Sequence, residues 1–175
     1  YNNEIFSDLK KWNHQGTYTN DDDALVRHVA HICDILKPNL KSSKLNVLVD
    51  VNHGAAALAN PILFNELGVS VDYLYPNADG VFSHAPEPLA KNLTKLCEKM
   101  AEGNYDIGFA QDPDADRLVI VDENGVFIGE DYSLAFCMDY FLSTYCESHV
   151  NEAINVVVNL STSQIIQWIC NKVGA

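Results

Sequence analysis

The sequence predicts an α/β fold, in the form of a three-layer α/β/α sandwich with a mixed, mainly parallel sheet. Short apolar runs that are typical of buried strands alternate with stretches of helical periodicity, and this alternation favours a parallel sheet covered by helices. Three such runs lie at 45–51, 69–75 and 106–111. Two further runs, 118–121 and 126–128, flank Asn124-Gly125, which is typical of a tight hairpin turn and adds an antiparallel pair.

Helical patterns fill the segments between these strands. The acidic run 21–23 is expected to open the first helix, because anionic side chains are favoured in a first turn, and Pro38 closes it. The turn Asn52-His53-Gly54 is expected to lead into a helical stretch that is interrupted or restarted at Asn60-Pro61. Two more helices are expected, one starting near Glu87 or Pro88 and one over 131–146.

The predicted sheet and its helices occupy residues 20–150, which we expect to form one domain. Residues 1–19 are polar and aromatic without a sustained period, so they are expected to be an interdomain connector. Residues 151–175 are expected to begin another domain with a new strand and a helix at 163–173. With 175 residues and 47% apolar content, the chain can bury one substantial core plus a remainder.

Composition excludes several classes of partner. The chain has 24 acidic and 11 basic residues, a net charge of −13, which disfavours nucleic acid and anionic membranes because both require basic patches. No apolar run approaches the roughly 18 residues of a spanning helix, and no signal peptide is visible. The five cysteines form no C-x-x-C pair and are expected to be reduced, buried and structural, which favours a cytoplasmic protein.

The densest chemistry lies in the run DIGFAQDPDADR, residues 106–117. Asp112, Asp114 and Asp116 occupy alternate positions after an apolar strand, and Arg117 follows at once. If the backbone curls there, the three carboxylates converge and repel one another unless a cation lies between them. Hard oxygen ligands at this density suit Mg²⁺ or Ca²⁺, so the sequence predicts a divalent-cation loop. The Asn-His-Gly turn is expected to lie nearby, because both follow predicted parallel strands.

Other interpretations of this loop are open. Carboxylates at positions 1, 3 and 5 with Glu123 at position 12 match an EF-hand, but Arg117 stands where the turn needs Gly, and the flanks resemble strands. A haloacid-dehalogenase phosphatase also has Asp-x-Asp after a strand, but its following Gly-Thr or close variant is missing. A merely solvated acidic loop would not need the restricted spacers Pro113 and Ala115, or an arginine directly after the acids.

Four motifs together resemble the α-D-phosphohexomutase family of phosphoglucomutase, phosphomannomutase and phosphoglucosamine mutase. DPDADR with LVIVDENG and FIGEDY resembles the metal-binding loop of that family, and LVDVNHGAAALANPILFNELGV resembles its strand, turn and helix. DGVFSHAPEPLAKNLTKL resembles the Pro-Glu-Pro loop, and VVVNLSTSQIIQWICNKVGA the opening of the next domain. The resemblance covers roughly residues 20–175, that is, the second domain and the start of the third.

The resemblance implies a phosphoryl transfer between C1 and C6 of a hexose through a phosphoserine and a bisphosphorylated intermediate. It implies that Asp112, Asp114 and Asp116 hold Mg²⁺ and that Arg117 contacts phosphate, the alternative for Arg117 being a salt bridge to a neighbouring aspartate. Three carboxylates and a dication leave roughly one negative charge, which the arginine would offset. The metal loop serves glucose, mannose and glucosamine phosphates alike, so it does not select the sugar.

Members of this family have four domains, so the chain is expected to be part of a longer enzyme, inactive by itself, with the missing domains and a hexose phosphate as its partners. Ser83-His84-Ala85-Pro86 lacks the Asn of the phosphoserine loop, so no phosphoserine is assigned here. His84 is a candidate substrate contact, the alternative being a histidine that pins its own loop. A different class of function is a non-enzymatic cation-binding or scaffold domain, which the phosphoserine motif upstream in the full gene would exclude.

Overall fold

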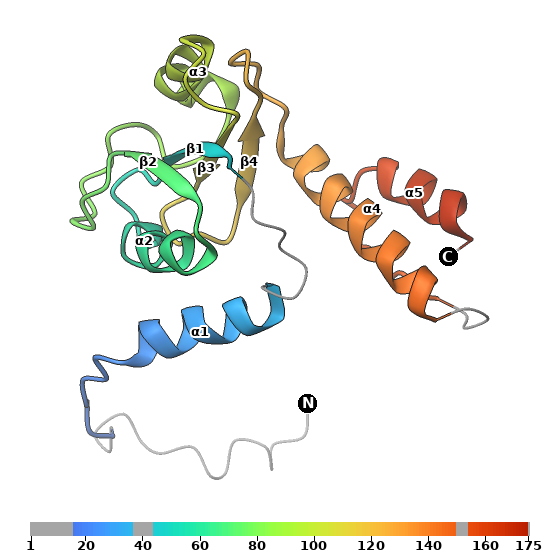
Figure 1. Ribbon diagram of the computed structural model, residues 1–175, viewed down its shortest axis with the longest axis horizontal. Coiled ribbons are helices and arrows are strands. Elements are labelled where there is room, and N and C mark those ends of the chain that lie inside the picture. Colours follow the sequence, from blue (N-terminus) through green and yellow to red (C-terminus); the bar gives the residue numbers. More distant parts are fainter. Residues whose placement is uncertain (1–15, 37–43, 150–153, 175) are drawn as a thin grey trace, which may run out of the picture.

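The structure, a computed structural model, describes residues 16–36, 44–149 and 154–174. Four strands form one sheet in the order β2-β1-β3-β4 (Figure 1). They are β1 (Asn46–Asp50), β2 (Ser70–Leu74), β3 (Ile107–Gln111) and β4 (Leu118–Val121). β1 pairs in parallel with β2 and β3, whereas β3 and β4 are antiparallel. The predicted α/β class and mixed, mainly parallel sheet are therefore confirmed.

Helices cover both faces of this sheet and are flanked by further helices (Figure 1). The helices are α1 (Ala24–Leu36), α2 (Ala56–Leu67), the short 3₁₀ helix η3 (Ala90–Asn92), α3 (Thr94–Ala101), α4 (Glu130–Ser148) and α5 (Ile165–Val173). α1 contacts the outer side of α2, and α4 contacts α5 as well as β4. The layers α2, sheet and α3 thus form the predicted three-layer sandwich.

The central strand β1 separates two hydrophobic clusters because its side chains alternate between the two faces. Leu48 packs on one face with Leu96 and Met100 of α3. Val47 and Val49 point to the other face, where they pack with the small residues at the start of α2. Asp50 shares the face of Leu48 and is 1% exposed. A buried carboxyl group therefore stands at the carboxyl end of the best-covered strand.

Helix α2 differs from its prediction. It runs without interruption from Ala56 to Leu67 and includes Pro61, where a break or restart was expected. Pro61 removes one backbone donor, but its restricted φ suits a helix and the buried side of the preceding turn is held against the sheet. The acidic run also differs in detail, because residues 21–23 precede the first helical residue instead of occupying the first turn.

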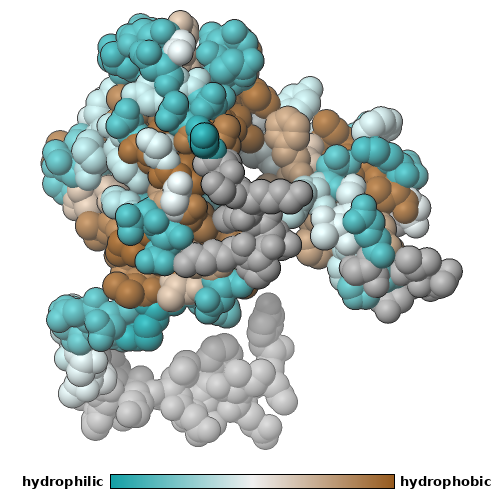
Figure 2. Space-filling model, in the orientation of Figure 1, coloured by the Kyte–Doolittle hydropathy of each residue, from teal (hydrophilic) through white to brown (hydrophobic). Residues whose placement is uncertain are grey.

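The C-terminal segment contradicts one prediction and confirms another. Residues 154–160 of the expected strand form no strand with any described residue, and 151–153 lie outside the described part. Without a partner strand, apolar side chains such as Val157 remain exposed. The helix expected at 163–173 is present as α5. Figure 2 shows hydrophobic surface over the α4–α5 pair, where exposed apolar residues include Phe136, Phe141 and Trp168.

The expected domain limits at 19 and 150 stay predictions, and most of the connector 1–19 lies outside the described residues. The buried residues Ala135 and Leu142 of α4 pack with α5 in a third cluster, separate from the two sheet clusters, which favours a boundary earlier than residue 150. The five cysteines are free, but Cys137 is exposed, so the prediction that all are buried is wrong. In the described part of the chain, no helix is long and apolar enough to cross a bilayer.

We expect Leu96→Ala to lower the free energy of unfolding by about 3 kcal/mol, because it leaves a cavity under the sheet. Leu96 is 0% exposed and belongs to the cluster that joins α3 to β1. Leu58 on α2 is 58% exposed, so Leu58→Ala is the matched control, with an expected change within about 0.5 kcal/mol. Urea unfolding followed by circular dichroism measures both variants. Equal losses would contradict the assigned core.

Candidate metal centre

The loops that follow β1, β2 and β3 gather at one edge of the sheet, because these strands are parallel. The turn after β1 touches the loop after β3 directly: the backbone N–H of Ala55 donates to the carbonyl oxygen of Pro113 at 2.8 Å. The turn also contacts the loop after β2, because the N–H of His53 donates to the carbonyl of Tyr75 at 2.8 Å. The expected proximity of the Asn-His-Gly turn and the aspartate loop is thus confirmed.

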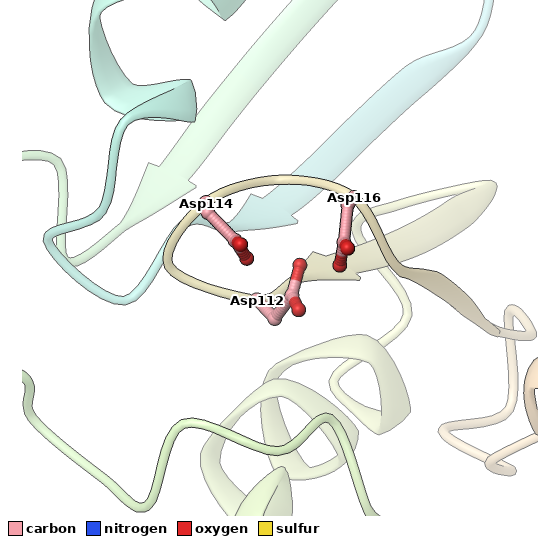
Figure 3. Close-up of side chains that lie close together, drawn as sticks. All are labelled: Asp112, Asp114 and Asp116. Carbon is pink, nitrogen blue, oxygen red and sulfur yellow. The ribbon is translucent and has the colours of Figure 1, made fainter. Parts of the chain in front are cut away.

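Asp112, Asp114 and Asp116 turn toward one another across the loop that leaves β3 (Figure 3). One carboxylate oxygen from each lies within 4.8 Å of the other two. The backbone curls at Ala115, whose φ is +61° and whose N–H donates to the carbonyl of Asp112 at 2.9 Å. Such a left-handed conformation costs an alanine roughly 1 to 2 kcal/mol, so the rest of the loop must hold it.

Arg117 binds the deepest of the three acids. Asp112 is 1% exposed, and its two oxygens accept hydrogen bonds from the Arg117 backbone N–H at 3.0 Å and from Nε at 2.7 Å. The Arg117 side chain is 47% exposed, and its two terminal nitrogens make none of the hydrogen bonds found among the described residues. The guanidinium therefore anchors Asp112 through Nε, which also lies 3.7 Å from Asp116 Oδ1, and the arginine side chain stays half exposed.

The pKa values of Asp112 and Asp116 are shifted in opposite directions. Burial raises the pKa of Asp112, but the hydrogen bonds from Arg117 outweigh it and set the pKa below its usual value. The pKa of Asp116 is raised, first by its hydrogen bond with Asp112 and then by repulsion from Asp114 and Asp112. This repulsion is what a divalent cation would relieve. The donor set, three carboxylates without nitrogen or sulfur, fits Mg²⁺ or Ca²⁺.

The structure excludes the EF-hand interpretation, because the loop joins β3 to β4 and an EF-hand loop joins two helices. Glu123, which that interpretation needs as a ligand, instead lies in the turn after β4. There, Asp122 accepts the backbone N–H groups of Asn124 and Val126 at 3.0 and 2.7 Å. The run 126–128 joins the sheet edge through a single bridge from Phe127 to Val121, so the predicted hairpin is present in shortened form.

His84 lies beside Asp50. Among the described residues it makes no hydrogen bond to Asp112, Asp114 or Asp116. Its Nε2 is 3.1 Å from Asp50 Oδ2, and its Nδ1 is 2.9 Å from the carbonyl of Ala85. Both ring nitrogens therefore have partners within the chain, an arrangement that favours the loop-pinning alternative. Its contact with substrate stays a prediction.

Asn52 completes this network. Its side-chain oxygen accepts the backbone N–H groups of Ser83 and His84 at 2.9 and 3.3 Å, and its amide donates to the carbonyl of His84 at 3.1 Å. Its own N–H donates to Asp50 at 3.0 Å. Burial raises the pKa of Asp50, although the neighbouring His84 opposes this. The network fixes the loop after β2 to the end of β1.

The comparison with known families decides what this domain is. The family model described as "Phosphoglucomutase/phosphomannomutase, alpha/beta/alpha domain II" matches residues 23–125, which include all four strands and the whole aspartate loop. The chain belongs to the phosphoglucomutase/phosphomannomutase family. The described fold agrees with this family's own description, since helices cover both faces of the sheet.

The relatives of this phosphoglucomutase/phosphomannomutase chain carry the names of mutases. The protein named "Probable phosphoglucosamine mutase" from Methanopyrus kandleri is 32% identical over 93% of this chain and 34% of its own length. The "Phosphoglucomutase/phosphomannomutase" of Thermococcus kodakarensis is 33% identical over 94% of this chain and 35% of its own. A crystal structure of a family member from Burkholderia thailandensis superposes with a TM-score of 0.64 at 30% identity, covering 75% of this chain and 28% of that one. The chain therefore spans about a third of the length of these relatives.

Sequence reasoning missed three residues of this phosphoglucomutase/phosphomannomutase domain. Asp50 looked like part of an apolar strand, Asn52 like a turn residue, and Gly54 like the usual small residue of a turn. The signal for Asp50 was present, because a charged residue inside a buried strand needs a partner. The partner itself, His84, lies 34 residues further along and could not be read from spacing.

We expect the stability difference between the unchanged chain and Asp50→Asn to depend on pH. The folded-state pKa of Asp50 is raised above the ordinary 3.8, so between the two values the unfolded carboxyl is ionised while the folded one still holds its proton. The contribution of Asp50 is thus present below about 3.8 and is lost as pH rises through the folded value. Thermal unfolding from pH 4 to pH 8 should show Asp50→Asn gaining stability relative to the unchanged chain. A difference that stays constant over this range would contradict the raised pKa.

Proposed function

We propose that this chain is the metal-binding domain of a phosphohexomutase, which interconverts hexose 1-phosphate and hexose 6-phosphate through a phosphoserine and a bisphosphorylated intermediate. The observation that carries the proposal is the convergence of three carboxylates at the end of β3, within a domain of this family. The names of the relatives support the reaction class.

In this proposal Asp112, Asp114 and Asp116 hold one Mg²⁺ ion, which would neutralise charge on a phosphate oxygen when bound. Arg117, whose side chain is half exposed, contacts a phosphoryl group with its terminal nitrogens while Nε keeps Asp112 in place. The two roles weighed for Arg117 are thus compatible, because they use different nitrogens. His84 holds its loop through Asp50 and the Ala85 carbonyl, and we propose it as a candidate contact with the sugar.

Because the chain spans about a third of the length of its relatives, we propose which parts of the active site it supplies and which lie in other segments. We propose that residues 20–150 supply the metal loop, that residues 151–175 open the next domain, and that segments corresponding to the rest of the relatives supply the phosphoserine and the sugar contacts. Neither Ser-His-Asn-Pro nor Gly-Glu-x-Ser-Gly-His occurs in the 175 residues. We place the enzyme in the cytoplasm, and the five free cysteines support this location.

The decisive experiment expresses the full-length product of the gene and measures conversion of the 1-phosphates of glucose, mannose and glucosamine with Mg²⁺ and a catalytic amount of sugar bisphosphate. We expect turnover of at least one of them, lost on adding a chelator. A full-length product that binds Mg²⁺ but converts none of the three would support the non-enzymatic alternative.

Asp114→Asn in the full-length protein should lower kcat/KM at least about tenfold, which corresponds to about 1.4 kcal/mol, because one charged ligand of the cation is lost. Asp114 is exposed, so the free energy of unfolding should change by less than about 0.5 kcal/mol. Asp34 on α1 is also exposed, and Asp34→Asn is the matched control that should change neither quantity. Steady-state kinetics and urea unfolding separate the two effects. Equal losses in both would contradict the metal assignment.

The 175-residue chain alone should bind Mg²⁺ in the millimolar range and show no mutase turnover. Mg²⁺ gives up its water reluctantly and normally takes one or two carboxylates together with a phosphate, so three mutually repelling aspartates form an incomplete site. Calorimetric titration with Mg²⁺ measures the affinity. Micromolar binding, or turnover of any hexose 1-phosphate, would show that the chain carries more of the site than proposed.

A further inference from the structure

The turn after β1 holds the aspartate loop by a backbone contact that leaves no room for a side chain. We propose that Gly54 is a positioning residue for the cation site: it lets the start of α2 lie directly against Pro113, between the first two aspartates. This inference rests on the proposed function of the aspartate loop, and it assigns to Gly54 and Ala55 a role that acts through Asp112 and Asp114.

Position 54 needs a glycine because the Pro113 backbone lies so close to it, and not because of its own backbone conformation. The φ of Gly54 lies outside the left-handed region, so the turn itself would accept another residue. A Cβ atom at this position would lie 2.6 Å from the carbonyl oxygen of Pro113 and 2.7 Å from its Cα. Both neighbours are backbone atoms, which cannot rotate away as the end of a side chain could. An alanine must therefore push the aspartate loop away from α2.

A hydrogen bond also sets the orientation of the Pro113 peptide relative to the start of α2. The N–H of Ala55 donates to the Pro113 carbonyl at 2.8 Å, and the N–H of Gly54 donates back to the carbonyl of Val51 at 2.7 Å, which closes the turn. Ala55 immediately precedes α2, where free N–H groups and the helix dipole give the backbone a partial positive charge. That end of the helix meets the loop at Pro113, the residue between Asp112 and Asp114.

A second tie from α2 reaches the loop on the other side of Asp112. Asn60, 6% exposed, donates from its side-chain amide to Oε1 of Gln111 at 2.6 Å. Gln111 directly precedes Asp112 and Pro113 directly follows it. Helix α2 thus holds both neighbours of the buried aspartate, so a shift of α2 relative to the loop changes the distance between that aspartate and the two exposed ones.

Backbone strain at this edge shows why such ties are needed. The four non-glycine residues with positive φ in the described chain are Asn52, His53, Tyr75 and Ala115. All four lie in the loops that follow β1, β2 and β3. Strained residues persist only where surrounding contacts over-determine their conformation. The contact of Gly54 and Ala55 with Pro113 joins the strained turn at Asn52 and His53 to the strained loop at Ala115.

The experiment compares two variants of the contact with two controls in the 175-residue chain. Gly54→Ala adds the clashing Cβ. Ala55→Pro removes the N–H that Pro113 accepts, at a residue whose φ of −62° suits proline and just before the helix, where proline is tolerated. Gly16→Ala is the neutral control, since no heavy atom of the described residues lies within 4 Å of its Cβ position. Gly108→Ala is the packing control, because its Cβ would meet the Met100 side chain at 2.9 Å under the sheet.

Two readouts are taken for each chain by NMR. Amide hydrogen exchange without added cation reports how firmly the loop is held, through the N–H groups of Ala115 and Arg117 that bond to Asp112. Titration with MgCl₂ into the tens of millimolar, followed at the amides of residues 112–117, gives the dissociation constant. We expect Gly54→Ala and Ala55→Pro to speed exchange at both amides and to raise the dissociation constant roughly tenfold, as loss of an outer-shell support does.

Gly108→Ala should lower the melting temperature, yet leave the dissociation constant within about twofold, because it disturbs packing and not the ligands. An unchanged dissociation constant and unchanged exchange in both contact variants would overturn the inference while leaving the proposed function in place. Equal weakening by Gly108→Ala would also overturn it, since general loosening would then explain the effect. A chain of unchanged sequence whose loop amides do not respond to Mg²⁺ would overturn the proposed function, and with it this inference.

Discussion

The parallel pairing of β1 with both β2 and β3 is the constraint on which the rest of the structure depends. Because Asp50 lies in register with Leu74 on one side and Ala110 on the other, all three strands end at the same level. The three loops that follow must therefore share one small region. Antiparallel β4 returns from that region, so the aspartate loop is short and held at both ends. The apolar packing of β1 on both faces fixes this arrangement far more firmly than any contact among the loops themselves.

Two buried aspartates at this edge have pKa values shifted in opposite directions, because their neighbours differ. Asp50 and Asp112 are each 1% exposed. Asp112 faces the permanent charge of Arg117 and keeps a lowered pKa, whereas burial dominates at Asp50, whose partner is a histidine, and its pKa is raised. The first group remains an anion and is suited to a cation site. The second shares its environment with His84 and Asn52 and is suited to holding loops together.

Much of this arrangement could be predicted from the sequence. Apolar runs located all four strands, and strand order placed the turn at Asn52 beside the aspartate loop. Errors arose where packing overrides local signals: Pro61 does not break α2, because the helix is held against the sheet. The strand expected near Val157 does not form, because β-propensity without a pairing partner gives no ladder. The roles of Asp50 and Gly54 depend on residues 34 and 59 positions away, His84 and Pro113, which periodicity cannot reveal.

Under the proposed function, the position of Arg117 explains how a strongly acidic loop could receive a phosphate. Its Nε donates a hydrogen bond to Asp112, the buried aspartate of the three, and lies 3.7 Å from Asp116 Oδ1, while Asp114 and Asp116 are exposed. The hydrogen bond with Asp112, and then repulsion from Asp114 and Asp112, raise the pKa of Asp116, and a cation between the three carboxylates would relieve that repulsion. Once a dication is bound, about one negative charge is left on the cluster, and the guanidinium beside it offsets that charge. In this proposal the arginine that holds Asp112 would also offset the negative charge around a bound phosphate, and both roles together need the planar, multi-donor side chain that lysine lacks.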